Sequence, residues 1–184
     1  MRVIGGTARS RLIEAPKGRD TRPTLDRVRE NLFNILAPRV PDSRVLDLFA
    51  GSGSLSLEAL SRGASFAVLC DHDRAAAAVE KKNLDTLGMT GRARVMHMSW
   101  QQTVSILASE EQHFDLIFLD PPYAMRDLTQ VTEQILPLMS EDALVILEHQ
   151  GNLLPLVSAE LVRTDQRRYG YCGLLFFQHL SREV

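Results

Sequence analysis

Short apolar runs alternate with amphipathic stretches along most of this chain. Apolar runs bounded by glycine, proline or acidic residues are typical of buried strands, and apolar residues spaced by three and four are typical of helices. This pattern predicts strands at Val45 to Phe49, Ser65 to Cys70, Ala93 to Met98, Phe114 to Leu119 and Leu144 to Leu147. It predicts helices from Leu55 to the Gly63 that ends the run, and at Ala75 to Leu87, Gln101 to Ala108 and Leu128 to Met139. Alternating strands and helices indicate an α/β fold with a doubly wound, mostly parallel sheet.

The last part of the chain follows a different pattern. Leu161 to Arg168 and Gly173 to His179 are two strand-like runs joined around Tyr169-Gly170-Tyr171. A turn between two such runs predicts an antiparallel hairpin, which would close a seven-stranded sheet. We therefore expect one domain over residues 1–184, with a core at residues 40–184 and an extension with its own helix at residues 1–39.

Composition is consistent with one soluble domain. The chain has 184 residues, of which 45% are hydrophobic, enough for a single α/β core. No apolar run approaches the length of a membrane span, and Met1-Arg2-Val3 does not begin a signal peptide. The two cysteines, Cys70 and Cys172, are expected to be small buried side chains, which points to the reducing cytoplasm. The five histidines have no Cys or His partners at ligand spacing, so we expect no metal.

Charge is divided unevenly along the chain. Residues 1–39 contain nine Lys or Arg and four acidic residues, a net +5, whereas the whole chain carries −2, which leaves −7 for the remainder. This asymmetry favours a phosphate-facing surface on the extension, and a merely solvated face is the alternative. The candidate phosphate-contacting residues are Arg9, Arg11, Arg19 and Arg22, with Arg167 on the hairpin.

The strand predicted at Phe114 to Leu119 ends in Asp120-Pro121-Pro122-Tyr123. Parallel sheets bind ligands at the carboxyl ends of their strands, where Asp120 would lie. The prolines stiffen the turn, and neither has an N–H to donate. Tyr123 offers a flat face for a planar ring. A carboxylate, a carbonyl and a stacking face together suit an exocyclic amine on a heterocycle.

A second motif, Asp47-Leu48-Phe49-Ala50-Gly51-Ser52-Gly53, joins a buried strand to a helix. Gly51 and Gly53 allow a ligand to approach the backbone, and the helix offers N–H groups. The third glycine of a dinucleotide fingerprint would fall at Ser56, so that fingerprint is absent. Asp47 instead resembles the acidic start of an S-adenosylmethionine signature.

A third acidic position follows the next predicted strand. Asp71-His72-Asp73 lies about 20 residues past the glycine turn, the offset at which a carboxylate can accept hydrogen bonds from ribose hydroxyls. Asp71 is the better candidate for this contact, because Asp73 stands where it would cap the helix that follows. His72 lies between the two.

Two further segments near the start complete the pattern: Val3-Ile4-Gly5-Gly6 and Thr21-Arg22-Pro23-Thr24-Leu25-Asp26-Arg27-Val28-Arg29-Glu30. With these segments and the three motifs above, the chain resembles the RsmD family of bacterial 16S rRNA guanine-N2 methyltransferases nearly from end to end. The resemblance implies a Rossmann-like class I methyltransferase with S-adenosylmethionine as cofactor and no metal. It implies transfer of a methyl group to one guanine of 16S rRNA, either free or in a small-subunit assembly intermediate, by a cytoplasmic monomer. Ser54, Ser56 and Ser99 depart from the residues most common in the family.

The resemblance also assigns roles to residues. The catalytic residues would be Asp120, Pro121, Pro122 and Tyr123. The cofactor-binding residues would be Thr24, Arg27, Asp47, Phe49, Gly51, Gly53, Asp71, His72, Ser99 and Trp100, although Trp100 also suits the core. Two alternatives stay open: an adenine-N6 or cytosine-N4 DNA methyltransferase, because Asp-Pro-Pro-Tyr would serve it equally, and a nucleic-acid-binding relative without activity.

Overall fold

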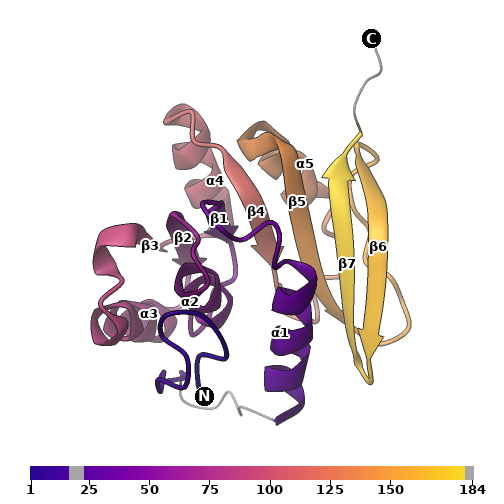
Figure 1. Ribbon diagram of the computed structural model, residues 1–184. Coiled ribbons are helices and arrows are strands. Elements are labelled where there is room, and N and C mark those ends of the chain that lie inside the picture. Colours follow the sequence, from indigo (N-terminus) through magenta and orange to yellow (C-terminus); the bar gives the residue numbers. More distant parts are fainter. Residues whose placement is uncertain (17–22, 181–184) are drawn as a thin grey trace.

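The computed structural model describes residues 1–16 and 23–180, and it contains one seven-stranded sheet (Figure 1). The strand order is β3-β2-β1-β4-β5-β7-β6. The first five strands of the chain are parallel, and β7 runs antiparallel to both β5 and β6. The strands are β1 (Arg44–Asp47), β2 (Phe66–Asp71), β3 (Ala93–His97), β4 (Phe114–Leu119), β5 (Met139–Gln150), β6 (Leu161–Tyr169) and β7 (Cys172–His179).

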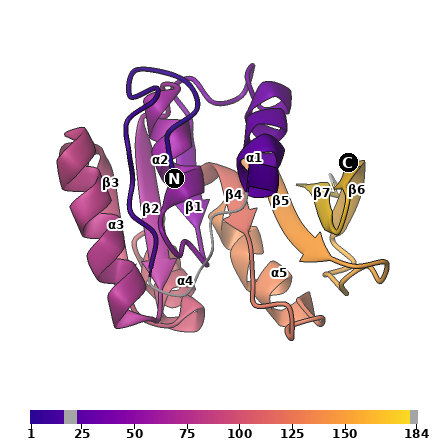
Figure 2. The same ribbon diagram turned by 90° about the horizontal axis from the view of Figure 1, so that it is seen from below.

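Helices cover both faces of the sheet. Figure 2 shows α1, α2 and α3 on one face and α4 and α5 on the other. The helices are α1 (Pro23–Ile35), α2 (Ser54–Ser61), α3 (Arg74–Leu87), α4 (Trp100–Ser109) and α5 (Thr129–Ile135), with short 3₁₀ helices η1 (Thr90–Arg92) and η2 (Leu136–Leu138). The α/β, doubly wound class predicted from the sequence is confirmed, as is its closing hairpin.

The central strand β4 shows why the core has two halves. Leu116 and Phe118 pack in the cluster under α1, α2 and α3, whereas Ile117 and Leu119 pack in the cluster under α4 and α5. All four side chains are buried, as expected for a parallel strand covered on both faces. Phe33 of α1 meets Phe118 with ring centroids 6.0 Å apart, which holds α1 against the sheet.

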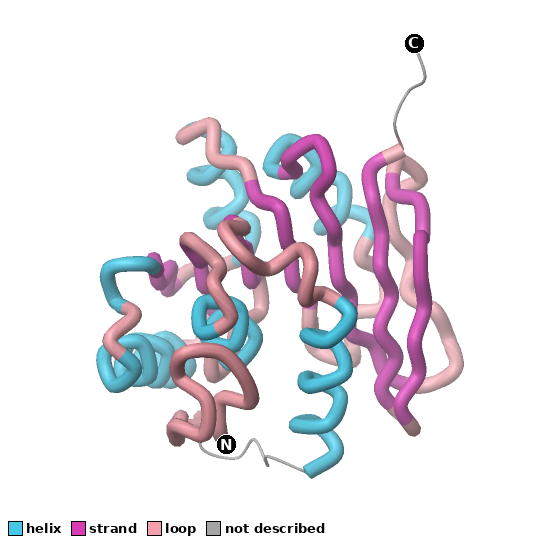
Figure 3. The backbone as a smooth tube through the Cα atoms, viewed as in Figure 1, coloured by secondary structure: helices cyan, strands magenta, loops and turns pink. Residues whose placement is uncertain are grey.

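Two predicted elements need correction. The helix predicted at Leu128 to Met139 is wrong at its carboxyl end, because α5 stops at Ile135 and Met139 already pairs with Phe114 as part of β5. Pro137 explains the stop, since it cannot donate the hydrogen bond that would continue an α-helix. The first strand is also shorter than predicted: β1 ends at Asp47, and Phe49 belongs to the turn that follows. Figure 3 shows the strands, helices and loops along the backbone.

Residues 1–16 fold back over α2 as a docked loop. The carboxylate of Glu58 accepts hydrogen bonds from the backbone N–H groups of Ile4 (2.8 Å) and Gly5 (2.7 Å), and from Nε of Arg62 (2.7 Å). Only 1% of Glu58 is exposed. A buried carboxylate with three charge-assisted hydrogen bonds is a strong anchor, so the loop is part of the body of the protein.

Gly6 allows the docked loop to approach α2. Its φ is +75°, and a Cβ built there would lie 1.9 Å from the carbonyl oxygen of Ser61. We expect Gly6→Ala to lower the free energy of unfolding by about 3 kcal/mol or more, because it adds a backbone clash to left-handed strain. Gly88→Ala is the matched control, since Gly88 has φ +68° with nothing within 4 Å and should cost only about 1 kcal/mol. Equal urea midpoints for the two variants would contradict the docking.

Candidate active site

Three acidic residues meet at the carboxyl edge of the sheet. Asp47 ends β1, Asp71 ends β2 and Asp120 directly follows β4. Because β1 pairs with both β2 and β4 in parallel, the three ends lie side by side. The strands of this part of the sheet point toward the lower edge in Figure 1, which Figure 2 views from below. The structure therefore brings together the motifs that lie far apart in the sequence.

The glycine turn connects β1 to α2. Gly51 and Gly53 both have positive φ, 58° and 76°, and Gly53 is the N-cap residue of α2. The N–H of Gly53 donates to the carbonyl of Ala50 (2.8 Å), which closes the turn. As the N-cap residue, Gly53 provides no side chain to cap α2. The first turn of the helix therefore begins at the edge of the sheet without a cap from its N-cap residue.

Asp71 fixes the position of this turn. Its Oδ2 accepts the N–H of Gly51 (3.0 Å) and its Oδ1 accepts the N–H of Asp73 (2.9 Å). The residue is 6% exposed. Asp73 accepts the N–H of Ala75 (2.9 Å) and caps α3, as predicted. The exposed imidazole of His72 lies 3.6 Å from Oδ1 of Asp71.

Asp47 is buried beneath the turn. Its Oδ2 accepts the hydroxyl of Ser56 (3.0 Å), whereas its Oδ1 has no hydrogen-bond partner in the described part of the chain. Burial raises the pKa of Asp47 to about 7, and the negative charge of Asp71 acts in the same direction, against the Ser56 hydrogen bond. A buried carboxylate oxygen without a partner at the turn is suited to a ligand that carries N–H donors or positive charge.

A fourth carboxyl group was not predicted from the sequence. Glu80 of α3 is 0% exposed, and neither of its oxygens has a hydrogen-bond partner among residues 1–16 and 23–180. Burial raises its pKa to about 8, and the charges of Asp47 and Asp71 add to the effect. Its position in the sequence could have indicated that it is buried, because Glu80 follows Ala76 and Ala77 on the apolar stripe of the helix.

Asn83 is a second residue that was not predicted. Its Nδ2 donates to the carbonyl oxygens of Ser52 in the glycine turn (3.0 Å) and of Glu14 in the docked loop (3.0 Å). Its Oδ1 accepts the N–H of Glu14 (2.8 Å). One buried side chain therefore ties the turn to the loop formed by residues 1–16.

The proline turn forms the other half of the site. Asp120 is half-buried, Pro121 is buried, and Pro122 and Tyr123 are exposed. The carbonyl of Pro122 accepts the N–H of Met125 (2.8 Å), which closes the turn. The ring of Tyr123 is 56% exposed, so a planar ligand can reach it.

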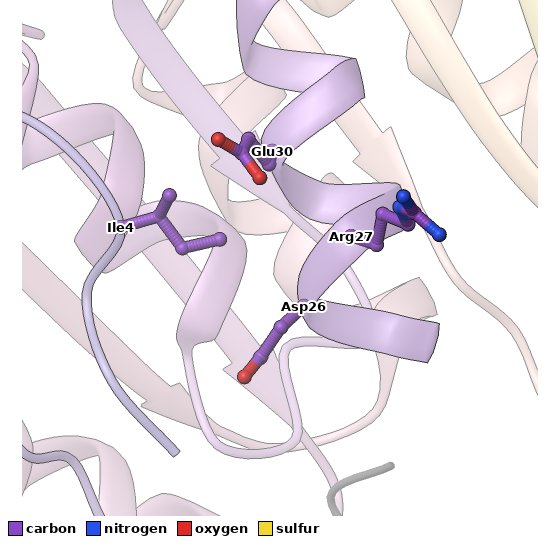
Figure 4. Close-up of a pocket in the computed structure, with 4 residues that line it drawn as sticks. All are labelled: Ile4, Asp26, Arg27 and Glu30. Atoms are coloured by element: carbon purple, nitrogen blue, oxygen red, sulfur yellow. The ribbon is translucent and has the colours of Figure 1, made fainter. Parts of the chain in front are cut away.

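Helix α1 stands beside the same edge. A cavity of about 400 Å³ between its first turns and the docked loop is lined by Ile4, Asp26, Arg27 and Glu30. Asp26 and Glu30 lie toward Ile4, whereas Arg27 points away from it (Figure 4). Thr24 lies in the first turn of α1, and its side chain is not among those that the structure describes.

The other predicted cofactor-site residues have local packing roles. Phe49 and Trp100 pack in the cluster under α4 and α5, and Trp100 is 9% exposed. Ser99 caps α4, where its side chain and that of Gln102 form a capping box. These positions follow β1 and β3, so they belong to the same edge as the glycine turn.

The predicted RNA-contacting residues fall in two places. Arg9 and Arg11 are exposed on the docked loop, where Arg11 donates to the carbonyl of Thr86. Arg167 lies on β6 and pairs with Asp165 (2.9 Å). Figures 1 and 2 place the loop and the hairpin on opposite sides of α1. Two further predicted contacts, Arg19 and Arg22, lie outside the described residues.

Residues 1–16 and 23–180 contain neither a metal-binding cluster nor a membrane-spanning helix. No group of three or more His, Cys, Asp or Glu side chains is arranged there to hold a metal ion. None of the helices in those ranges is long and apolar enough to span a membrane. Cys70 and Cys172 are buried free thiols on β2 and β7, which agrees with the expectation.

Comparison with known proteins identifies the family. The model of the family described as "Conserved hypothetical protein 95" matches residues 1–178. The chain belongs to this family, the RsmD family. It is 43% identical to "Ribosomal RNA small subunit methyltransferase D" of Escherichia coli, over 86% of this chain and 80% of that protein. It is 38% identical to "Putative rRNA methyltransferase YlbH" of Bacillus subtilis, over 97% and 98% of the two chains.

Solved structures agree with the RsmD assignment. The "Putative methyltransferase yhhF" of Escherichia coli superposes with a TM-score of 0.82 and 37% identity, over 97% of each chain. A putative methyltransferase complexed with SAH superposes with a TM-score of 0.70 at 15% identity, over 85% of this chain and 50% of that one. At that identity the second likeness shows the fold alone. This RsmD-family chain has the class I methyltransferase fold.

The raised pKa of Glu80 predicts that the stability of this RsmD-family protein depends on pH. A carboxyl group whose pKa is raised in the folded state contributes stability below its ordinary pKa, and this contribution is lost as pH rises through about 8. We expect Glu80→Gln to flatten the decline in unfolding free energy between pH 5 and pH 8.5, and to stabilise the protein at pH 8.5 by at least about 1 kcal/mol. Asp85→Asn, an exposed change on the same helix, should leave the decline in place. Urea denaturation at several pH values measures both, and parallel curves for wild type and Glu80→Gln would refute the assignment.

Proposed function

We propose that this protein transfers a methyl group from S-adenosylmethionine to the exocyclic N2 amine of one guanine in 16S rRNA, in the cytoplasm and either on free RNA or on a small-subunit assembly intermediate. One observation carries the proposal. The glycine turn follows β1 and the Asp120 turn follows β4, and because these strands are parallel neighbours, both turns lie at the same edge of the sheet. A methyl donor on the first turn would face an amine on the second. The names of the Escherichia coli and Bacillus subtilis relatives support RNA as the acceptor.

The residues around the glycine turn fit a nucleoside sulfonium cofactor. The turn lets a ligand approach the backbone, and Oδ1 of Asp47 has no partner among the described residues, so it can accept a donor. Asp71 is fixed by two backbone N–H groups and retains lone pairs for ribose hydroxyls. We assign the remaining contacts to Phe49, His72, Ser99 and Trp100 on the adenine side, and to Thr24 and Arg27 on the side of α1. When bound, the cofactor supplies an activated methyl group on sulfur.

The Asp120 turn prepares the amine. The lone pair of the guanine N2 amine is delocalised into the ring, so attack requires the nitrogen to become pyramidal. Asp120 and the carbonyl of Pro121 accept hydrogen bonds from the two N–H groups of the amine and favour that geometry. The amine passes its proton to Asp120, and from there to water, only as the methyl group arrives, so a strongly tuned base is unnecessary. Most of the acceleration comes from in-line positioning of nitrogen, methyl and sulfur.

Tyr123 holds the base after it leaves its stack. Unstacking costs a few kcal/mol, and stacking on an exposed aromatic face restores part of it. Arginine side chains on the docked loop, on the segment before α1 and on the hairpin contact phosphates, which orients the RNA without reading its sequence. Because the loop and hairpin flank α1, the RNA would cross this helix.

The acceptor is tested directly with labelled S-adenosylmethionine. Purified protein is incubated separately with unmethylated 16S rRNA, assembled small subunits and duplex DNA, and the modified nucleoside is identified by mass spectrometry. We expect N2-methylguanine in RNA from one or both ribosomal substrates. Label only in the adenine or cytosine of DNA, or no transfer at all, would refute the proposed function.

Asp120 should be needed for transfer and not for cofactor binding. We expect Asp120→Ala to lower kcat by about 100-fold or more, because the amine loses its acceptor, while the Kd for S-adenosylmethionine changes by less than about threefold. Asp142→Ala is the control, since Asp142 is an exposed carboxylate on β5. Single-turnover kinetics and calorimetry measure the two quantities, and near-normal kcat in folded Asp120→Ala would remove this role.

Substitutions at Asp71 and Asp73 distinguish a role in cofactor binding from a role in capping α3. We expect Asp71→Asn to weaken S-adenosylmethionine by about 1–3 kcal/mol, because the ribose loses a charged acceptor. Asp73→Ala should lower stability by about 1 kcal/mol through the lost cap, with little change in affinity. Calorimetry and thermal melting give the comparison. A larger affinity loss in Asp73→Ala than in Asp71→Asn would transfer the ribose contact to Asp73.

A further inference from the structure

A second carboxylate lies beside Asp120 at the edge of the sheet. Leu119 of β4 pairs with Leu147 of β5 in parallel register, so Asp120 and Glu148 are the next positions on neighbouring strands. Two residues earlier, Phe118 and Ile146 pair with each other and pack in the cluster under α1. Strand alternation directs Asp120 and Glu148 toward that same face.

The thiol of Cys172 connects Glu148 to this face. Cys172 belongs to the same cluster under α1, and its Sγ donates to Oε1 of Glu148 (3.3 Å). Burial raises the pKa of Cys172, and the charges of Glu148 and Asp120 raise it further. The thiol therefore stays protonated and remains a donor with both carboxylates in its surroundings. A carboxylate offers about four acceptor sites, so the bond from Cys172 leaves Glu148 with capacity for a ligand.

The order of the strands fixes the direction in which a base would extend. β4 lies between β1, which leads into the glycine turn, and β5, which carries Glu148. An amine held at Asp120 and directed at a methyl group over the glycine turn leaves the rest of its ring on the β5 side. With the Watson–Crick edge turned toward β5, the ring nitrogen beside the amine-bearing carbon on that edge would then face Glu148.

Guanine differs from adenine and cytosine at that ring atom. Beside its N2 amine guanine has an N1–H donor, whereas the ring nitrogens beside the amines of adenine and cytosine are acceptors. Flipped bases are read along this edge. We propose that Glu148 accepts the N1–H of the target base and so selects guanine over adenine and cytosine. This inference rests on the proposed function and names a specificity-determining residue for it.

Burial and the hydrogen bond from Cys172 shift the pKa of Glu148 in opposite directions. Burial raises its pKa, whereas the hydrogen bond from Cys172 lowers it and favours the carboxylate. The N1–H donor of guanine would favour the ionised form further, because an N–H group stabilises a carboxylate. A ring-nitrogen acceptor would face a carboxylate that repels it, which is an energetic penalty against the wrong base.

The first test uses the unaltered protein and a changed substrate. A 16S rRNA fragment is prepared with guanine or with 2,6-diaminopurine at the methylated position, found beforehand by mass spectrometry. Diaminopurine keeps the 2-amine and lacks the N1–H. We expect kcat/KM to fall roughly 10- to 100-fold, the factor that a hydrogen bond to a charged group contributes. Equal kcat/KM for the two RNAs would overturn the inference without touching the proposed function.

The second test changes the protein. The amide of Glu148→Gln can donate to the N1 acceptor of diaminopurine, so the preference for guanine should shrink at least about 10-fold or reverse. A purely structural role would lower transfer to both RNAs equally, and that result would overturn the inference. Glu141→Gln, an exposed change on β5, should keep the wild-type ratio. Thermal melting monitors folding, and failure of Glu148→Gln to fold leaves the substrate comparison in the wild-type protein as the deciding measurement.

Absence of any transfer to guanine by the wild-type protein would overturn the proposed function and this inference together. Transfer to guanine with an unchanged ratio in Glu148→Gln would overturn the inference alone. Cys172→Ala supplies an independent variant, because it removes the donor that holds Glu148. We expect it to reduce the guanine preference less than Glu148→Gln does, and a preference stronger than that of wild type would contradict the arrangement.

Discussion

The two hydrogen bonds that Asp71 accepts from backbone N–H groups determine the geometry of the edge. One bond holds Gly51 of the turn after β1, and the other holds Asp73 at the start of α3. A charged acceptor satisfying two backbone donors fixes both segments relative to β2. One side chain therefore holds the turn before α2 and the start of α3 in place. The carboxylates of Asp47 and Glu80 are buried close to it.

The sequence was sufficient to predict the order of the elements because strands buried on both faces give continuous apolar runs, as β4 does. Asp71 and Asp120 were also predictable, since each directly follows such a run. Asp47 was expected inside its strand and was singled out by the glycine motif after it. The errors came at boundaries. Met139 lies in an apolar stretch with Leu136 and Leu138, and periodicity alone does not show where a helix gives way to a strand. The fold and the family were confirmed, whereas the roles of individual residues stay predictions.

The buried and half-buried polar residues around the site were not predictable from local patterns. In the sequence they resemble ordinary helix or strand residues, and only the topology shows which groups they contact. These residues are Glu58, Glu80, Asn83 and Glu148. Glu58 binds segments more than fifty positions away along the chain, and no local rule contains that information. Nor did the charge asymmetry reveal that α1 would separate the loop carrying Arg9 from the hairpin carrying Arg167.

The position of β7 has a consequence for folding during synthesis. β7 follows β6 in the chain but lies between β5 and β6 in the sheet. Until residues 172–179 have left the ribosome, β5 has no partner on that side and β6 has no sheet to join. Between the emergence of β5 and that of β7, the nascent chain therefore carries an exposed apolar strand edge, which is the kind of surface that chaperones bind and that promotes aggregation. A chain truncated before β7 would lose β6 as well, since β6 reaches the sheet only through β7.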